Sequence, residues 1–148
     1  MNKILFPVLF GFAFIFFIVG NAAAHCEIPC GIYDDEARIA MLLEHTATIE
    51  KSMIQIMELE KEVHHNSNQL IRWVMNKERH ADELQEIVTQ YFMTQRITLD
   101  VKDYDKKLGI LHQMLIYGMK CKQTTDLSHV EKLRMLIKEF QDLYFKKE

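Results

Sequence analysis

The sequence contains few of the residues that interrupt helices. Its 148 residues include two prolines, Pro7 and Pro29, and five glycines, of which only Gly109 and Gly118 follow residue 34. Proline removes a backbone N–H and glycine weakens a helix, so residues 34–148 run without a strong break. Long Gly/Ser/Pro linkers are also absent, which favours one domain over this stretch.

A surplus of positive charge is lacking as well. The chain has 18 Lys and Arg against 21 Asp and Glu, for a net charge of -3, and no Lys/Arg-rich block stands out. Nucleic-acid-binding proteins need a basic patch or stripe to neutralise phosphates. The sequence therefore gives no indication of a nucleic acid partner.

Apolar residues instead recur at helical spacing in four stretches after residue 34. The first stretch combines one row of residues seven apart with a second row three positions ahead, as amphipathic helices do. In chain order, the four sets are Ile39, Leu42, Thr46, Ile49, Met53, Ile56 and Val63; Leu70, Val74, Ala81, Leu84, Val88 and Tyr91; Tyr104, Leu108, Leu111 and Leu115; and Val130, Leu133, Ile137, Phe140 and Tyr144. Four amphipathic helices with short joins predict an all-α four-helix bundle over residues 34–148.

Local signals predict the ends of these helices. Residues 64–68, HHNSN, are typical of a polar turn, and Ser128 with Glu131 forms a capping-box pattern that predicts the start of the last helix. Methionines such as Met75 and Met135 share the helical spacing, so we expect them to fill the core. Five histidines share no clean ligand spacing beyond one adjacent pair, and we expect them mainly at the surface: His45, His64, His65, His112 and His129.

The amino-terminal segment has the pattern of an export signal. A positive start ending in Lys3 is followed by an uncharged apolar run from Ile4 to Gly20, and small residues stand at Ala22 and Ala24. This pattern predicts a signal peptide over residues 1–24 that signal peptidase removes, with export to the periplasm or outside the cell and no membrane attachment afterwards. An uncleaved membrane anchor is the alternative, although the run is short of the roughly 20 residues that a bilayer needs. A lipid on Cys26 is a weaker alternative, because His25 stands where a small residue is expected.

Two of the three cysteines follow the predicted cut. A Cys26–Cys30 disulfide would enclose too few residues to stabilise the fold much, because loop-closure stabilisation grows with loop length. A redox dithiol is a further alternative, although such pairs normally occur in mixed α/β folds with two intervening residues. The third, Cys121, is expected to be a lone thiol near a helix end.

A metal site would use every polar group of residues 25–30. After the cut, His25 offers an α-amine and an imidazole, Cys26 offers a thiolate and its backbone nitrogen, and Cys30 offers a second thiolate. Pro29, with its fixed φ, and Gly31, with its wide conformational range, could turn the chain so that Cys30 returns to the metal. Two nitrogens and two sulfurs in a plane suit Ni(II) or Cu(II) better than zinc, which prefers a tetrahedron.

The segment HCEIPCGIY at residues 25–33 resembles the amino-terminal hook of the nickel superoxide dismutases, His-Cys-x-x-Pro-Cys-Gly-x-Tyr. The segment QYF at residues 90–92 is similar to that family too. The resemblance implies a homohexamer of four-helix bundles with one nickel ion per subunit in each hook, residues 25–33. It further implies an oxidoreductase that disproportionates superoxide to oxygen and hydrogen peroxide at a mononuclear Ni(II)/Ni(III) centre.

The resemblance also assigns roles to individual residues. It implies that His25, Cys26 and Cys30 ligate nickel and that Tyr33 controls access and holds small oxygen species. Glu27 stands at a variable acidic position, and Tyr91 matches a second tyrosine near the site.

The family supports its axial imidazole with a glutamate and an arginine, but Ala40 falls at the glutamate position here. His80 lies near the arginine position and is our candidate for a substitute, with Glu44 as a second. A periplasmic protein that binds copper or nickel without turnover, and a structural bundle with an incidental disulfide, are the competing hypotheses.

Overall fold

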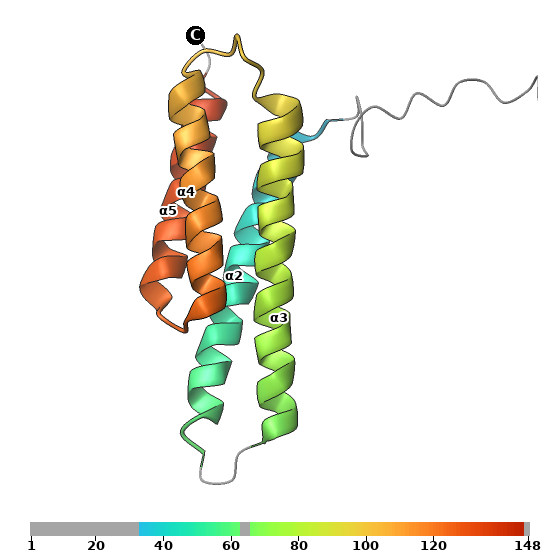
Figure 1. Ribbon diagram of the computed structural model, residues 1–148, viewed down its shortest axis with the longest axis vertical. Helices are drawn as coiled ribbons and strands as arrows, with labels where there is room; N and C mark the ends of the chain where they lie inside the picture. Colours follow the sequence, from blue (N-terminus) through green and yellow to red (C-terminus); the bar gives the residue numbers. More distant parts are fainter. Residues whose placement is uncertain (1–32, 63–65, 147–148) are drawn as a thin grey trace, which may run out of the picture.

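The computed structural model describes residues 33–62 and 66–146, and these form a bundle of four helices (Figure 1). The elements are α2 (Asp35–Leu59), α3 (Ser67–Glu86), which continues directly as the π-helix η1 (Ile87–Arg96), α4 (Tyr104–Gln123) and α5 (Leu127–Tyr144). Within the two described ranges there is no strand. The predicted all-α four-helix bundle is confirmed.

Several predictions concern residues that lie outside the described ranges. These are the signal peptide over residues 1–24, the division before residue 25, and the hook residues His25, Cys26, Glu27 and Cys30. Among the hook residues, only Tyr33 is described. No helix among the described residues is both long and apolar enough to cross a membrane.

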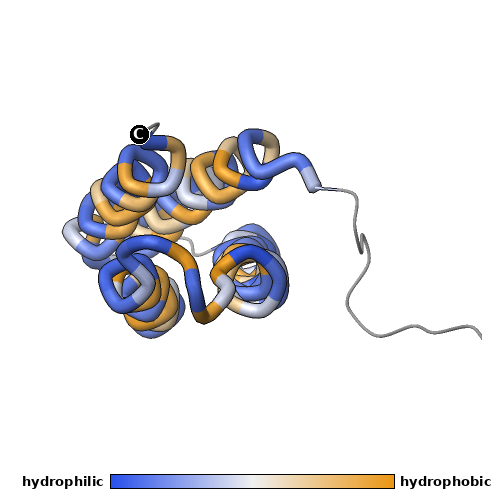
Figure 2. Tube along the Cα trace, turned by 90° about the horizontal axis from the view of Figure 1, so that it is seen from above, coloured by the Kyte–Doolittle hydropathy of each residue, from blue (hydrophilic) through white to orange (hydrophobic). Residues whose placement is uncertain are grey.

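The core lies between the four helices, where their apolar faces meet (Figure 2). It includes nearly all of the residues that the periodicity predicts. The following are less than 9% exposed: Ile39, Leu42, Ile49, Met53, Ala81, Leu84, Val88, Tyr91, Leu111, Val130, Leu133, Ile137 and Phe140. Aromatic edge contacts of Phe92 with Phe140 and with Tyr144 join η1 to α5, with ring centroids 5.0 and 5.7 Å apart.

Three of the predicted core positions are wrong. Val74 is 38% exposed, Met75 66% and Met135 64%. The α2–α3 hairpin extends beyond the end of the α4–α5 pair (Figure 1), and the two residues on α3 precede Lys77, which contacts Cys121 near the end of α4. An apolar residue on this extension has fewer partner helices than one in the middle of the bundle. Periodicity reports which face of a helix is apolar, but not how many neighbours cover it.

The helix starts differ from the predictions by a few residues. Asn66 caps α3 by accepting a hydrogen bond from the backbone N–H of Gln69, so Ser67 and Asn68 are helical and not part of the turn. Helix α5 begins at Leu127 because the side chain of Asp126 accepts the backbone N–H of Ser128. The predicted Ser128 capping box is therefore wrong, since an Asp two residues earlier takes the cap.

A buried lysine joins the two hairpins. The Lys77 ammonium on α3 donates to the backbone carbonyl of Cys121 at 3.0 Å and also to that of Lys122, at the end of α4. The last carbonyls of a helix have no partner within it and carry partial negative charge. One ammonium thus satisfies two of them and fixes α3 against α4.

The chain folds so that four segments meet at one end of the bundle. Figure 1 shows the start of α2, the end of η1, the start of α4 and the end of α5 at this end. Tyr33 immediately precedes α2. The predicted hook therefore joins the bundle at the end where these segments gather.

Candidate metal centre

The start of α2 fixes the point at which the hook meets the bundle. Asp34 caps the helix, and its side chain accepts the backbone N–H of Ala37 at 3.0 Å. Asp35 and Glu36 follow in the first turn, where the helix dipole favours negative charge. These interactions hold Tyr33 at the edge of the bundle.

Asp35 is the centre of a hydrogen-bond network that joins three helices. Its Oδ1 accepts from the Tyr91 hydroxyl at 2.6 Å and from Arg96 Nε at 2.8 Å. Its Oδ2 accepts from Arg96 Nη2 at 2.7 Å and from the Tyr144 hydroxyl at 2.9 Å. A carboxylate offers about four lone-pair positions, so these four bonds fill the acceptor capacity of Asp35.

The π-helical turn places Tyr91 and Arg96 on the same side. Backbone hydrogen bonding in η1 links residues five apart, as in the bond from the N–H of Ile97 to the carbonyl of Phe92 at 2.9 Å. Residues i and i+5 therefore stack along this segment, whereas in an α-helix the stacked residues are three or four apart. Because of this winding, both side chains reach the same carboxylate.

The network fixes the protonation of its members. Burial by itself would raise the pKa of Asp35, but the hydrogen bonds from Arg96, Tyr91 and Tyr144 outweigh it and lower that pKa. Burial and the bond to Asp35 raise the pKa of Tyr91 to about 12 and that of Tyr144 to about 12. At neutral pH both tyrosines stay protonated and donate to an ionised Asp35.

Tyr33 packs directly on this network. Its ring meets that of Tyr91 edge to face, with centroids 6.0 Å apart, and the Arg96 guanidinium carbon lies 4.3 Å from the Tyr33 ring centroid. Tyr33 is nevertheless 41% exposed. Its aromatic face is thus held by the bundle while part of the side chain remains open to solvent.

A second arginine adds positive charge beside the two tyrosines. The Arg38 guanidinium carbon lies 5.0 Å from the Tyr91 ring centroid, and Arg38 Nη1 approaches the sulfur of Met41 at 3.6 Å. In the part of the chain that the structure describes, no carboxylate pairs with Arg38, whereas Arg96 is neutralised by Asp35. Arg38 thus contributes positive charge beside Tyr91 at this end of the bundle.

The structure brings some of the predicted site residues together and separates another. Tyr33 and Tyr91, predicted from separate segments, are in contact. His80 lies 11 residues before Tyr91, about 16 Å along the helix axis at 1.5 Å per residue, and its ring contacts His45. Glu44 and Ala40 are exposed on α2. The role of His80 beside His25 stays a prediction, because residue 25 lies outside the described ranges.

Sequence reasoning missed Asp35, Arg96 and Arg38 as members of the site. Asp35 was recognised only as a charge that favours a helix start, and the arginine positions carried no signal. The partners of Asp35, which are Tyr91, Arg96 and Tyr144, lie 56, 61 and 109 residues away from it along the chain, so helical periodicity could not predict these contacts. His25, Cys26 and Cys30, which lie outside the described ranges, carry the nitrogen and thiolate donors that nickel favours.

A helical bundle preceded by such candidate donors in the sequence is typical of a helical metalloprotein. Comparison with known protein families matches residues 20–148 to nickel-containing superoxide dismutase, and the chain belongs to this family. It is therefore an oxidoreductase that contains nickel and takes superoxide as its substrate, disproportionating it to oxygen and hydrogen peroxide. No curated protein and no solved structure matches the chain.

Proposed function

We propose that residues 25–33 form the nickel-binding hook of this superoxide dismutase, with His25, Cys26 and Cys30 as ligands to one nickel ion per subunit. Two observations support this assignment. The family match spans residues 25–33, and Tyr33, the last of them, packs on the Asp35 network. The thiolates and the nitrogens of His25 and Cys26 form a donor set that suits nickel.

The reaction converts two superoxide ions and two protons into one molecule of oxygen and one of hydrogen peroxide. When bound, nickel supplies the one-electron redox couple that this exchange requires. The two thiolates would hold the ion and stabilise its higher oxidation state. Tyr33 would orient superoxide at the open side of the hook, with Glu27 and Tyr91 nearby in supporting roles.

Arg38 would draw the anionic substrate towards this end of the bundle. Superoxide is small and negatively charged, so a local positive field raises its rate of capture even when the whole protein is acidic. The Arg38 guanidinium beside Tyr91, which pairs with no carboxylate within residues 33–62 and 66–146, would contribute such a field. Asp35 would act only by holding Tyr91 and Tyr144 in place. Its carboxylate accepts hydrogen bonds from both hydroxyls and has no acceptor position left for another donor.

An amino-terminal extension tests whether the α-amine of His25 is a ligand. Adding one Ala before His25 turns that amine into a peptide nitrogen without changing any side chain. We expect loss of superoxide turnover and of the nickel–thiolate absorption bands, with unchanged helical content by circular dichroism. Full activity in the extended protein would exclude the amine as a ligand.

Removal of the thiols tests the remaining ligands. Cys26→Ser and Cys30→Ser should each lose nickel, measured by elemental analysis, while Cys121→Ser should retain it. The matched control is informative because Cys121 is a fully buried free thiol on α4. Retained nickel and turnover in both hook variants would refute the assignment.

Processing between Ala24 and His25 by signal peptidase belongs to the same proposal, because only this cut exposes the amine. The mature protein would then be periplasmic or extracellular and free of the membrane. Amino-terminal sequencing of the exported protein should begin His-Cys-Glu. A different first residue, or a lipid on Cys26, would contradict it.

A homohexamer is the proposed assembly. Its support in this chain is an apolar strip on the outer face of α3, where Ile71 is 58% exposed, Val74 38% and Met75 66%. Residues three and four apart lie on one side of a helix, so the three side chains form a continuous contact surface. Light scattering should give six chains per particle, and Ile71→Glu should reduce that number. A monomer at working concentrations would contradict the assembly.

A further inference from the structure

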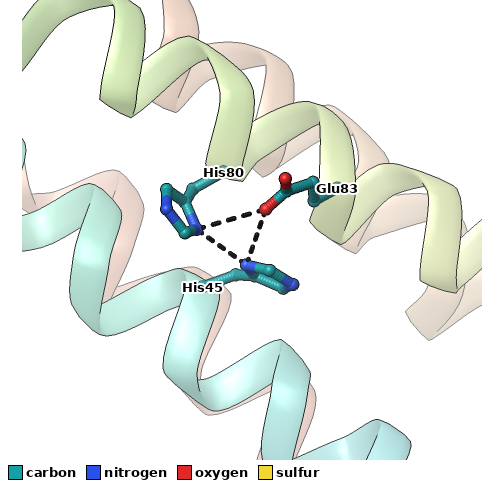
Figure 3. Close-up of side chains that lie close together, drawn as sticks. All are labelled: His45, His80 and Glu83. Atoms are coloured by element: carbon teal, nitrogen blue, oxygen red, sulfur yellow. Dashed lines mark hydrogen bonds and ion pairs between the residues drawn. The ribbon is translucent and has the colours of Figure 1, made fainter. Parts of the chain in front are cut away.

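Two histidines and a glutamate converge between α2 and α3 (Figure 3). His45 Nδ1 lies 2.8 Å from His80 Nδ1, and each of these atoms lies 3.4 Å from Glu83 Oε2. The three side chains come from two helices. Their ligand-type atoms nevertheless face a single point.

The three separations fit a metal ion. Three atoms at these distances lie on a circle of radius about 1.9 Å, slightly less than a zinc–nitrogen bond of about 2.0–2.1 Å. An ion about 1 Å out of their plane would therefore sit at bonding distance from all three without movement of the helices. The remaining coordination positions would point away from the triangle.

The protonation of the cluster favours an ion as well. Burial lowers the pKa of His45, an effect that His80 reinforces and that Glu83 and Glu44 only partly oppose. A neutral imidazole can carry its proton on Nε2 and leave Nδ1 free as a ligand. The two Nδ1 atoms lie 2.8 Å apart, whereas Glu83 Oε2 lies 3.4 Å from each of them and accepts no short hydrogen bond from either imidazole.

The cluster is open to solvent on one side, and its carboxylate keeps one oxygen for an ion. The side chain of His45 is 12% exposed and that of His80 17%, whereas that of Glu83 is 42% exposed. The carboxylate thus forms the open side, through which an ion or water can enter. Arg79 lies 3.9 Å from the other oxygen of Glu83, Oε1, and so leaves Oε2 to the imidazoles.

The site uses the geometry of helical bundles. His80 and Glu83 are three residues apart on α3, so they share one face, and His45 projects from the facing helix α2. Metal sites inside bundles combine an i, i+3 pair on one helix with ligands from its neighbour. The cluster lies ten residues along α2 from Asp35, about 15 Å from the end where the hook enters.

We propose that His45, His80 and Glu83 form a second metal site, which binds a divalent transition-metal ion of the zinc class and clips α2 to α3. Two imidazoles and one carboxylate suit zinc and its neighbours, whereas calcium and magnesium need mainly oxygen ligands. With three protein ligands, at least one position is left for water. None of the three ligands belongs to residues 25–33.

Zinc binding in protein that lacks the hook thiols tests the site. Cys26→Ser/Cys30→Ser protein, freed of metal, is dialysed against Zn²⁺, and bound zinc is measured by elemental analysis and titration calorimetry. We expect one equivalent per chain. We also expect a higher thermal midpoint with zinc, since an ion that binds only the folded state stabilises it. Co²⁺ in place of zinc should give visible bands typical of nitrogen and oxygen ligands, without thiolate bands.

Variants of the three ligands locate the bound ion. In the thiol-free background, His45→Ala, His80→Ala and Glu83→Gln should each weaken zinc at least about tenfold, because losing even a residue that only supports a ligand costs about 10–100-fold. His112→Ala, at an exposed histidine on α4, should bind like the parent. Glu83→Gln preserves size at a partly exposed position, so it keeps the test valid if a histidine variant misfolds. No zinc in the parent, or equal binding by Glu83→Gln and His112→Ala, would overturn the proposal.

Discussion

Asp35→Asn is expected to destabilise the bundle by about 3 kcal/mol at neutral pH. The substitution keeps one acceptor oxygen but replaces the other by an amide NH₂ that faces donors, so about half of the four hydrogen bonds are lost. A hydrogen bond to a charged group contributes about 1.5–3 kcal/mol. Since the side chains of Asp35 and Arg96 are 16% and 28% exposed, we take the lower end for each of two bonds.

The pH dependence gives the same prediction a second readout. The folded-state pKa of Asp35 is lowered, so its stabilising contribution is complete above the unfolded pKa of about 3.9 and is lost as the pH falls through the folded value. The difference in unfolding free energy between the native protein and Asp35→Asn should therefore be the same at pH 7 and pH 5. Below about pH 4 it should shrink.

Urea unfolding followed by circular dichroism measures both effects, at one fixed protein concentration because self-association also stabilises the fold. Asp142→Asn, at an exposed position of α5, makes the same chemical change outside the network and should alter stability by less than about 0.5 kcal/mol. Tyr144→Phe removes one bond and should cost about 1.5 kcal/mol. A loss below about 1 kcal/mol for Asp35→Asn, or a difference that does not shrink in acid, would refute the network.

Three further predictions concern single side chains. Arg38→Gln should lower kcat/KM for superoxide by about threefold to tenfold at low salt, and the difference should shrink as salt screens the charge. Arg72→Gln, at the end of α3 far from Tyr91, should leave kcat/KM unchanged. Equal losses in the two variants would argue against local steering. Lys77→Met should cost about 2–3 kcal/mol in urea unfolding because two carbonyls at the end of α4 lose their donor, and an unchanged midpoint would contradict this. Cys121 should resist iodoacetamide in the folded protein, since burial raises the pKa of its thiol to about 11, and rapid labelling detected by mass spectrometry would show that the site opens.

The local sequence was sufficient to predict the helices and most of the core. Period and burial coincide for Leu42, Ile49 and Ile56 because an amphipathic helix has only one face that it can bury. The same argument failed for Met75, whose face is apolar but lies where the hairpin extends past its neighbours. The hook at residues 25–33 stays a prediction from sequence, which could be made because its candidate donors lie within six residues and depend on no distant partner.

Only the tertiary structure decided which distant side chains meet. Asp35 acquires its role from Tyr91, Arg96 and Tyr144, and a π-helical turn that no propensity predicts aligns two of these three. The local sequence offered no ligand spacing for His45, which was predicted at the surface, and placed His80 only as a candidate support for His25. The surface prediction was wrong for His45, whose side chain is 12% exposed and lies 2.8 Å from His80 on the facing helix. Chemistry confined to one segment can be predicted from its spacing, whereas chemistry shared between helices depends on how those helices pack.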